Sequence, residues 1–305
     1  MRCCRPGRPG RQGRTGAAAP GGRLPCAGAV GPASAAVAPV PARRGGVRCA
    51  GAPPLLRRLL VDEADHFRTY LASAPQTNEV MRSAVLIGGY AAIAERTGLP
   101  LALREVGASA GLNLLWDRFH YTLGEQRWGD EASPVRIVSD WRGHVPSLPP
   151  RIAVADRRGN DLLPIDVGDD AAVLRLRSYV WPDQAARMAR LQGALALARR
   201  ERPVVDAGDA AAWVARELAA PRPDAVTVLA HSVVWQYLPP ETRERIDAAL
   251  AAAARQARDD GPLALAAHGV LRQRRAGRAA AHAVARWRGA HAGRAHPHGE
   301  WVEWV

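Results

Sequence analysis

The chain has 305 residues and 48% hydrophobic content, which is sufficient for a folded core. Its formal net charge is +13, and every basic residue other than His is Arg. The excess lies at the two ends, because residues 1–61 carry 11 Arg and no acidic residue and residues 261–305 carry 7 Arg against 2. Residues 62–260 carry 24 Arg against 27 acidic residues. This mildly acidic centre lacks a basic surface for phosphates, so we expect no nucleic-acid partner.

The first 53 residues are rich in Arg, Gly and Pro and can bury too little apolar surface to offset the entropy of an unfolded chain. We therefore predict a disordered arm there, or a wrongly assigned start of the coding sequence. The absence of Cys after residue 49 predicts a core without disulfides, as in the reducing cytoplasm. The apolar stretch Ala27–Val40 contains Gly and Pro and is too short to cross a bilayer, so we expect no membrane association.

Apolar residues at helical spacing predict a helical segment over residues 54–100, with a break at Pro75 and a second helix capped by Thr77 or Asn78. From there onward strand patterns alternate with helical patterns, which is typical of a parallel sheet with crossover helices. We predict a doubly wound, mostly parallel α/β domain of Rossmann-like type over residues 101–305. Its strands are predicted at Leu101–Val106, Ile152–Ala155, Val204–Val205, Ala225–Ala230 and Pro262–Ala267.

The turn after the first predicted strand fits two different chemistries. Gly107, Ser109 and Gly111 match the G-x-S-x-G pattern of a serine-hydrolase nucleophile elbow. Glu105, two residues before the first glycine, also gives the E-x-G-x-x-x-G form found in methyltransferases that use S-adenosylmethionine. In those enzymes the turn receives the methionyl end of the cofactor. The third glycine of the dinucleotide fingerprint G-x-G-x-x-G is missing, which argues against a pyrophosphate.

Position in the chain favours the cofactor interpretation over the hydrolase. A nucleophile elbow normally follows several strands and an upstream loop that supplies oxyanion donors. Here the turn follows the first predicted strand, and no HGGG-like stretch precedes it. A serine hydrolase built on Ser109 stays an alternative, since an acid and a His follow it. The candidates for these two roles are Asp209 or Asp224, and His231, His268, His296 or His298.

Two later carboxylates extend the cofactor interpretation to the next two strands. Asp161 ends a turn predicted over Arg157–Asp161, after the second strand, where a carboxylate can accept ribose hydroxyls. Asp209 follows the third strand, where a carboxylate can bind the adenine amino group. Each Asp also has a simpler interpretation as a turn or helix-cap residue. The predicted residues for binding the cofactor are Glu105, Gly107, Ser109, Gly111, Asp161 and Asp209.

His231 and Ser232 follow the fourth predicted strand, where such enzymes often contact substrate, and they are the predicted catalytic residues. His231 is the candidate base for a protonated acceptor such as a hydroxyl. The alternative is a structural His bonded to the backbone. His291, His296 and His298 have no acidic or Cys partner at zinc spacing, so no metal is predicted.

Several blocks of the chain together resemble one family. Over about residues 55–260 the sequence resembles the bacterial domain of unknown function 2332, which is itself regarded as methyltransferase-like. That resemblance implies a methyltransferase fold, S-adenosylmethionine as cofactor, and a small-molecule acceptor that it does not identify. The blocks are TNEVMRS (77–83), REVGASAGLNLLWDRFHY (104–121), RGNDLLPIDV (158–167), YVWPDQAARMARLQGAL (179–195), AGDA (207–210) and HSVVWQYLP (231–239).

Two departures from the family pattern bear on activity. Asn160 stands where the family typically has an apolar residue, and residues 268–295 lack acidic residues and strand alternation. A local frameshift that is compensated before residue 296 would produce the second departure. A nucleotide-binding protein that no longer catalyses is therefore a further alternative, and the sequence leaves the oligomeric state open.

Overall fold

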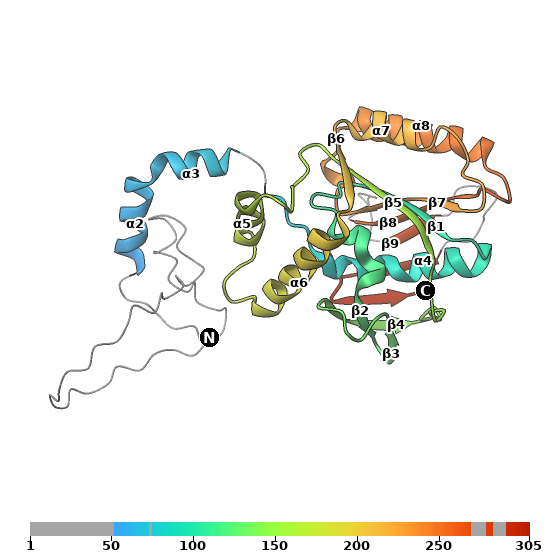
Figure 1. The fold of residues 1–305 in the computed structure, drawn as a ribbon, viewed down its shortest axis with the longest axis horizontal. Coiled ribbons are helices and arrows are strands. Elements are labelled where there is room, and N and C mark those ends of the chain that lie inside the picture. The colour runs from blue at the N-terminus through green and yellow to red at the C-terminus, as the bar shows by residue number, and fades with distance from the viewer. Residues whose placement is uncertain (1–51, 73–74, 270–278, 283–290) are drawn as a thin grey trace, which may run out of the picture. The chain divides into compact units, whose positions relative to one another are not determined.

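The structure, a computed structural model, describes residues 52–72, 75–269, 279–282 and 291–305 (Figure 1). The chain divides into two compact units, the first ending at Ala72. The described part of the first unit is two helices, α2 (Ala52–Asp62) and α3 (Ala64–Leu71). Most of the predicted arm lies outside the described residues, and its last two residues begin α2.

The second unit combines helices with one sheet, in which eleven strands are paired within the described residues. Its α-helices are α4 (Ser83–Thr97), α5 (Asp170–Ser178), α6 (Ala185–Glu201), α7 (Ala210–Glu217) and α8 (Pro240–Gln256), and its 3-10 helices are η1 (Val80–Arg82), η2 (Leu112–Arg118) and η3 (Trp235–Tyr237). Its strands are β1 (Leu101–Val106), β2 (His120–Leu123), β3 (Gln126–Trp128), β4 (Arg136–Gly143), β5 (Val154–Asp161), β6 (Val204–Ala207), β7 (Val226–Ser232), β8 (Leu263–His268), β9 (Ala279–His282), β10 (His291–Ala295) and β11 (Trp301–Trp304).

Five neighbouring strands are parallel, in the order β8-β7-β1-β5-β6. β1, the first of these strands in the chain, lies in the middle of the five. β5 and β6 lie on one side of it, and the later strands β7 and β8 lie on the other. Beyond β8 the sheet continues through β9, β10, β11, β4, β2 and β3. β2 and β3 form an antiparallel hairpin at the far edge of this sheet. The prediction of an α/β fold with a mostly parallel sheet is confirmed.

Helices cover both faces of the parallel strands. Successive side chains of a strand point to opposite faces, so Leu103 and Val228 pack into one core with α4 and α6. Val106 and Leu229 pack into a second core with α7 and α8. Figure 1 shows α4 on one side of β1, β7 and β8 and the pair α7 and α8 on the other. Burial on both faces agrees with the apolar runs within these strands, Leu101–Leu103 of β1 and Val228–Ala230 of β7.

The observed ends of β5, β6, β7 and β8 all lie beyond the predicted ones, and the differences at β5 and β7 change the assignment of site residues. β5 includes Arg157–Asp161, which was predicted as a turn; that prediction was wrong. The charged side chains that suggested a turn are each paired, Arg157 with Asp117 and Arg158 with Asp206. β7 likewise continues through His231 and Ser232, so both belong to the strand and obey its alternation.

The segment before α4 is tied to the glycine turn after β1. Asn78 Oδ1 accepts a hydrogen bond from the backbone N–H of Leu112, at 3.2 Å. Asn113 Nδ2 donates to the carbonyl of Glu79, at 3.3 Å. These two contacts join residues 34 positions apart and fix the start of η2, which follows the turn. α4 itself ends at Gly98, whose φ of 66° favours glycine.

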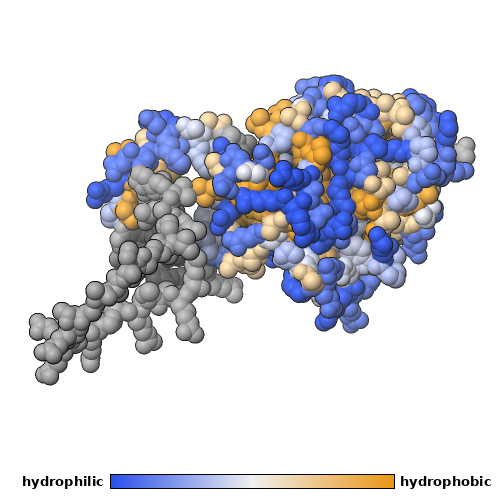
Figure 2. Space-filling view, in the orientation of Figure 1, coloured by the Kyte–Doolittle hydropathy of each residue, from blue (hydrophilic) through white to orange (hydrophobic). Residues whose placement is uncertain are grey.

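The visible face of the molecule is mostly hydrophilic, with apolar residues scattered among polar ones (Figure 2). Scattered exposed hydrophobic side chains are ordinary on soluble protein surfaces. Among the described residues, no helix has both the length and the apolar character that crossing a bilayer requires.

Candidate functional site

The candidate site lies beyond the carboxyl ends of the parallel strands, beside β1. Ligands of open α/β sheets bind where the strand order reverses, and β1 with β7 forms that point here. Glu105 lies one residue before the end of β1, while Asp161, Ser232 and His268 end β5, β7 and β8. The register pairs Glu105 with Ala230 and Ser232 with His268. Paired residues face the same way, so all four side chains lie on the face that α4 covers.

Glu105 is a buried acid whose negative charge would be only partly balanced by nearby positive charge. Its side chain is 4% exposed. Burial raises the pKa of its carboxyl to about 8, with the positive charge of Arg82 opposing the rise and the negative charge of Asp161 adding to it. The carboxyl therefore holds a proton at neutral pH until another positive charge approaches. This behaviour suits a residue that binds a cationic group.

The glycine turn after β1 is held by hydrogen bonds within the protein. The backbone N–H groups of Gly107 and Ala108 both donate to the carbonyl of Asn160, at 2.8 and 2.9 Å. The backbone N–H of Ser109 donates to the Asp161 carboxylate at 2.9 Å. Because these donors are engaged, the turn does not offer the row of free N–H groups that holds a phosphate.

Both glycines of the turn are required by backbone conformation and by close packing. Gly107 has φ 71° and Gly111 has φ 69°, in the left-handed region. A Cβ on Gly107 would lie 2.6 Å from Val234 Cγ2, and one on Gly111 would lie 2.9 Å from Val205 Cγ2. The turn can therefore sit tightly between the loop after β7 and the edge strand β6.

Ser109 does not have the surroundings of a nucleophile. Its φ is 56°, and its Oγ is buried with no hydrogen-bond partner among the described residues. A serine hydrolase needs a His hydrogen-bonded to that oxygen. The described part of the chain thus offers an unpartnered hydroxyl in the turn, and no base for it.

Asp161 lies where a ribose-binding carboxylate was predicted, and it also supports the loop that follows. Its Oδ1 accepts from the backbone N–H of Leu163 at 3.0 Å and from Gln76 Nε2 at 3.3 Å. Its Oδ2 accepts from the Ser109 N–H at 2.9 Å. An ionised carboxylate has about four acceptor positions, so one more donor can be accommodated.

Asp209 is the N-cap of α7. Its Oδ1 accepts from the backbone N–H of Ala212 at 2.9 Å and lies 3.2 Å from Arg245 Nη2. Its side chain is 45% exposed. Asp209 therefore caps α7 through Oδ1. Its Oδ2 can accept a hydrogen bond from a further donor beyond the end of β6.

His231 lies on the opposite face from Glu105. As the neighbour of Ala230 in β7 it points toward α7 and α8, and its ring stacks on Trp235 with centroids 5.2 Å apart. Trp235 packs against the core of that face. The structure thus brings Ser232 together with Glu105 and separates His231 from them, in agreement with a packing role for this ring.

Arg82 and His268 also lie at the site, although neither was among the residues predicted to bind the cofactor or to catalyse, and His268 was named only as a candidate base of the hydrolase alternative. Arg82 Nε donates to the carbonyl of Pro297 at 3.3 Å, and His268 Nε2 lies 3.2 Å from the same oxygen. This carbonyl therefore joins η1 to the end of β8, next to Glu105. The signal was weak, because His268 falls one residue after the predicted end of its strand.

Two of the buried histidines, His231 and His268, predict an acid-sensitive fold. Burial lowers the pKa of His231 and of His268 to about 4, from 6.5. Below pH 6.5 the unfolded chain binds protons that the native state excludes, so the free energy of unfolding falls as the pH drops to 4. A shift of this size corresponds to about 3 kcal/mol per ring.

We expect urea unfolding at pH 7, 5.5 and 4.5 to show this loss. The variant His231→Phe should lose less stability on acidification than the wild type. Substitution of the exposed His144 by Gln is the matched control and should leave the pH dependence unchanged. Equal pH dependence in wild type and His231→Phe would contradict the assignment for that ring.

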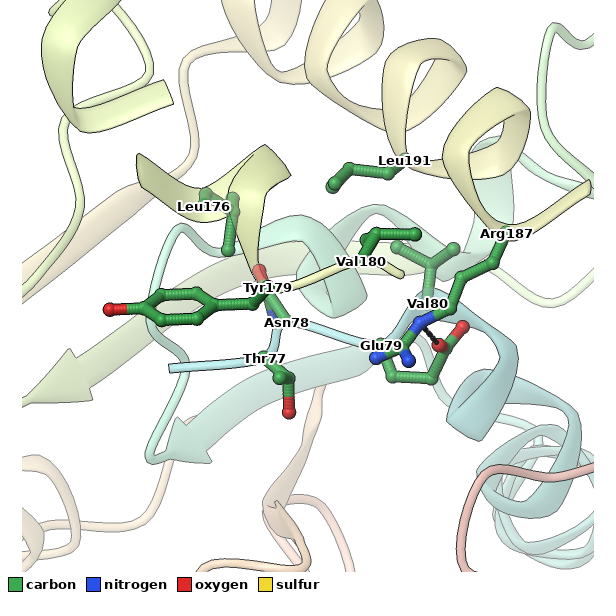
Figure 3. A pocket seen from close by; sticks show the side chains of 9 residues that line it. All are labelled: Thr77, Asn78, Glu79, Val80, Leu176, Tyr179, Val180, Arg187 and Leu191. Atoms are coloured by element: carbon green, nitrogen blue, oxygen red, sulfur yellow. Dashed lines mark ion pairs between the residues drawn. The ribbon is translucent and has the colours of Figure 1, made fainter. Parts of the chain in front are cut away.

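Two cavities of different size lie near the glycine turn and the segment before α4. The smaller one lies between η1, α5 and α6, where Glu79 and Arg187 form an ion pair of 2.5 Å (Figure 3). Its volume of about 10 Å³ is room for roughly one water. The larger one, about 580 Å³, is lined by Ala110 of the glycine turn, by residues 164–168 and by Val205 of β6. This volume is in the range of small-molecule sites.

Comparison with known proteins agrees with the resemblance seen in the sequence. A family model described as "Uncharacterized protein conserved in bacteria (DUF2332)" matches residues 33–304. No curated protein and no solved structure matches the chain. Residues 270–278 and 283–290, where the family pattern is weakest, lie outside the described residues. The chain belongs to the DUF2332 family of uncharacterised bacterial proteins.

Proposed function

We propose that this chain is an S-adenosylmethionine-binding protein of the methyltransferase type, acting on a small-molecule acceptor. One observation carries the proposal. Glu105, Asp161 and Asp209 lie at or just beyond the carboxyl ends of β1, β5 and β6, three adjacent strands of the parallel sheet. The strand order, which reverses at β1, supports a doubly wound, Rossmann-like sheet with its ligand at this edge.

The residues present suit this cofactor chemically. Glu105 is a buried acid whose raised pKa requires a cationic partner for ionisation, and the cofactor carries an ammonium and a sulfonium. Ser109 Oγ is a buried hydroxyl to which no described residue bonds. Asp161 and Asp209 each have acceptor capacity left. The cavity of about 580 Å³ touches the glycine turn at Ala110, although the proposed cofactor residues themselves do not line it. The engaged N–H groups of the turn argue against a pyrophosphate cofactor.

Each residue then has a defined task. The cofactor, when bound, supplies an activated methyl group. Glu105 would hold its cationic end, Asp161 its ribose hydroxyls and Asp209 its adenine amino group. The face that carries Ser232 would position the acceptor, and positioning can supply much of the rate of such a displacement.

The proposal predicts a selective thermal shift. S-adenosylhomocysteine should raise the unfolding temperature, whereas NADH and ATP should not, because the turn lacks free phosphate-binding N–H groups. Asp161→Asn and Asp209→Asn should each reduce the shift, since a neutral amide accepts more weakly from a hydroxyl or amino group. Asp259→Asn, on an exposed carboxylate, is the matched control and should retain it. A shift with NADH or ATP alone would contradict the cofactor assignment.

The serine hydrolase alternative has its own test. A fluorophosphonate probe labels an activated serine, and its label should not appear on this chain, because Ser109 Oγ has no base among the described residues. Labelling that disappears in Ser109→Ala would overturn the proposed function.

A further inference from the structure

His268 has an unused hydrogen-bond acceptor inside the candidate site. Its ring is 3% exposed, and its Nε2 lies 3.2 Å from the carbonyl oxygen of Pro297. A carbonyl oxygen can only accept, so Nε2 carries the hydrogen and donates it. The other ring nitrogen, Nδ1, is then a bare acceptor. It has no hydrogen-bond partner among the described residues.

Neighbouring residues keep the His268 ring neutral, with its hydrogen on Nε2. Arg82 Nε donates to the same Pro297 carbonyl at 3.3 Å, which fixes the oxygen that His268 bonds. Burial, helped by the positive charges of Arg82, His296 and His298, lowers the pKa of His268 to about 4, while the bond to Pro297 opposes this. The ring is therefore neutral near pH 7 and Nδ1 can accept a hydrogen bond, while the lowered pKa makes it a weak base that takes a proton only as the methyl transfer releases one.

The strand register places His268 beside Ser232, on the face proposed to position the acceptor. His268 pairs with Ser232 in the register of β7 and β8, and its side chain lies on the same sheet face as Glu105. A buried acceptor without a donor costs about 1–3 kcal/mol, a cost that a ligand with a donor removes. Hydroxyl and amine groups are such donors.

We infer that His268 Nδ1 binds the hydroxyl or amine of the methyl acceptor and takes its proton during transfer. The inference rests on the proposed function, because it names the substrate class of that site. The bond that forms joins the acceptor oxygen or nitrogen to the methyl carbon. The bond that breaks joins that carbon to the sulfonium sulfur, which keeps the electron pair, and the acceptor proton moves to Nδ1.

Two substitutions of His268 distinguish the role of Nδ1 from that of Nε2. His268→Gln places an amide near the position of Nε2, so it can still donate to Pro297 while it removes the acceptor at Nδ1. His268→Asn does the reverse, since its side-chain oxygen falls near the position of Nδ1. A purely structural His would be replaced best by Gln. A ligand-binding Nδ1 would be replaced better by Asn.

The experiment is an NMR titration of ¹⁵N-labelled imidazole groups in the full chain, saturated with S-adenosylhomocysteine. The probes are phenol and benzylamine, with toluene as a control of similar shape that has no donor. We expect the donors to shift the His268 Nδ1 resonance and toluene to leave it in place. His268→Gln should stay folded and bind phenol at least about tenfold more weakly, as loss of one hydrogen bond predicts. His144→Gln, at an exposed histidine, should bind it like the wild type.

The outcomes distinguish this inference from the proposed function. If S-adenosylhomocysteine binds but no donor moves Nδ1, or if His268→Gln binds phenol like the wild type, the inference is wrong and the cofactor assignment stands. If S-adenosylhomocysteine does not bind the folded chain, the proposed function fails. A phenol response in that case would leave only a donor-binding site at His268.

Discussion

Replacement of Glu105 by Gln is expected to weaken S-adenosylhomocysteine binding by about 10- to 100-fold, the value of a charge-assisted hydrogen bond. It should also abolish a proton release. In the free protein the Glu105 pKa is raised to about 8, so the carboxyl is protonated at pH 7. Pairing with the ligand ammonium requires the carboxylate, so binding to the wild type should release close to one proton.

Calorimetric titration at pH 7 in phosphate and in Tris measures that proton, because the two buffers differ in ionisation enthalpy. The wild type should give a heat that depends on the buffer, and Glu105→Gln should give none of this dependence. Glu125→Gln, at an exposed acid of the β2–β3 turn, is the matched control. Equal proton release by wild type and Glu105→Gln would show that Glu105 is not the group that ionises.

The same acid affects the stability of the ligand-free protein in a defined direction. Its folded-state pKa lies above the unfolded value of 4.5, so the native state binds the proton more tightly between pH 4.5 and 8. Stability from this group is present below pH 4.5 and is lost as the pH rises toward 8. Glu105→Gln should therefore be more stable than the wild type at pH 9, by a few kcal/mol.

Replacement of Glu217 by Gln is expected to destabilise the second unit by about 3–5 kcal/mol. Arg104 is 1% exposed and lies on the face of β1 that α7 covers. Its guanidinium is held by Glu217 at 2.8 Å and by Asp156 at 2.5 Å. Removing the more buried of these two carboxylates leaves a charged group under-compensated in the core, which is more costly than losing a surface pair.

Urea unfolding followed by circular dichroism at 222 nm checks this effect. Glu244→Gln, at an exposed position of α8, is the matched control and should change stability by less than about 0.5 kcal/mol. The loss in Glu217→Gln should persist at high salt, because buried pairs are little screened. A loss no larger than that of the control would mean that Asp156 alone compensates Arg104.

The parallel strands could be predicted because they are buried on both faces and therefore appear as apolar runs. β1 starts and ends at the predicted residues. The strand predicted at Ile152–Ala155 overlaps only the start of β5, whose end was missed because it carries Arg157 and Arg158, and their partners Asp117 and Asp206 are distant in sequence. α5 has nine residues and buries only Val173 and Leu176, so it shows less than one full repeat of an apolar helical face. The pairing of β11 with β4 is non-local and leaves no local signal.

Within the candidate site, the residues found from sequence are those whose position depends on a strand end. Glu105 and Asp161 lie on one face because their strands are parallel and adjacent. The choice of His231 over His268 depended on where β7 and β8 stop. Since β7 includes His231, alternation turns its ring away, and the same alternation turns His268 toward the site.

The central claim is that the edge of β1, β5 and β6 binds S-adenosylmethionine. Calorimetric titration of the wild-type chain with S-adenosylhomocysteine tests this claim most directly. The account predicts one ligand bound per chain, with a dissociation constant in the micromolar range or below, about −8 kcal/mol or stronger. No measurable binding by a chain whose circular dichroism shows it to be folded would contradict it.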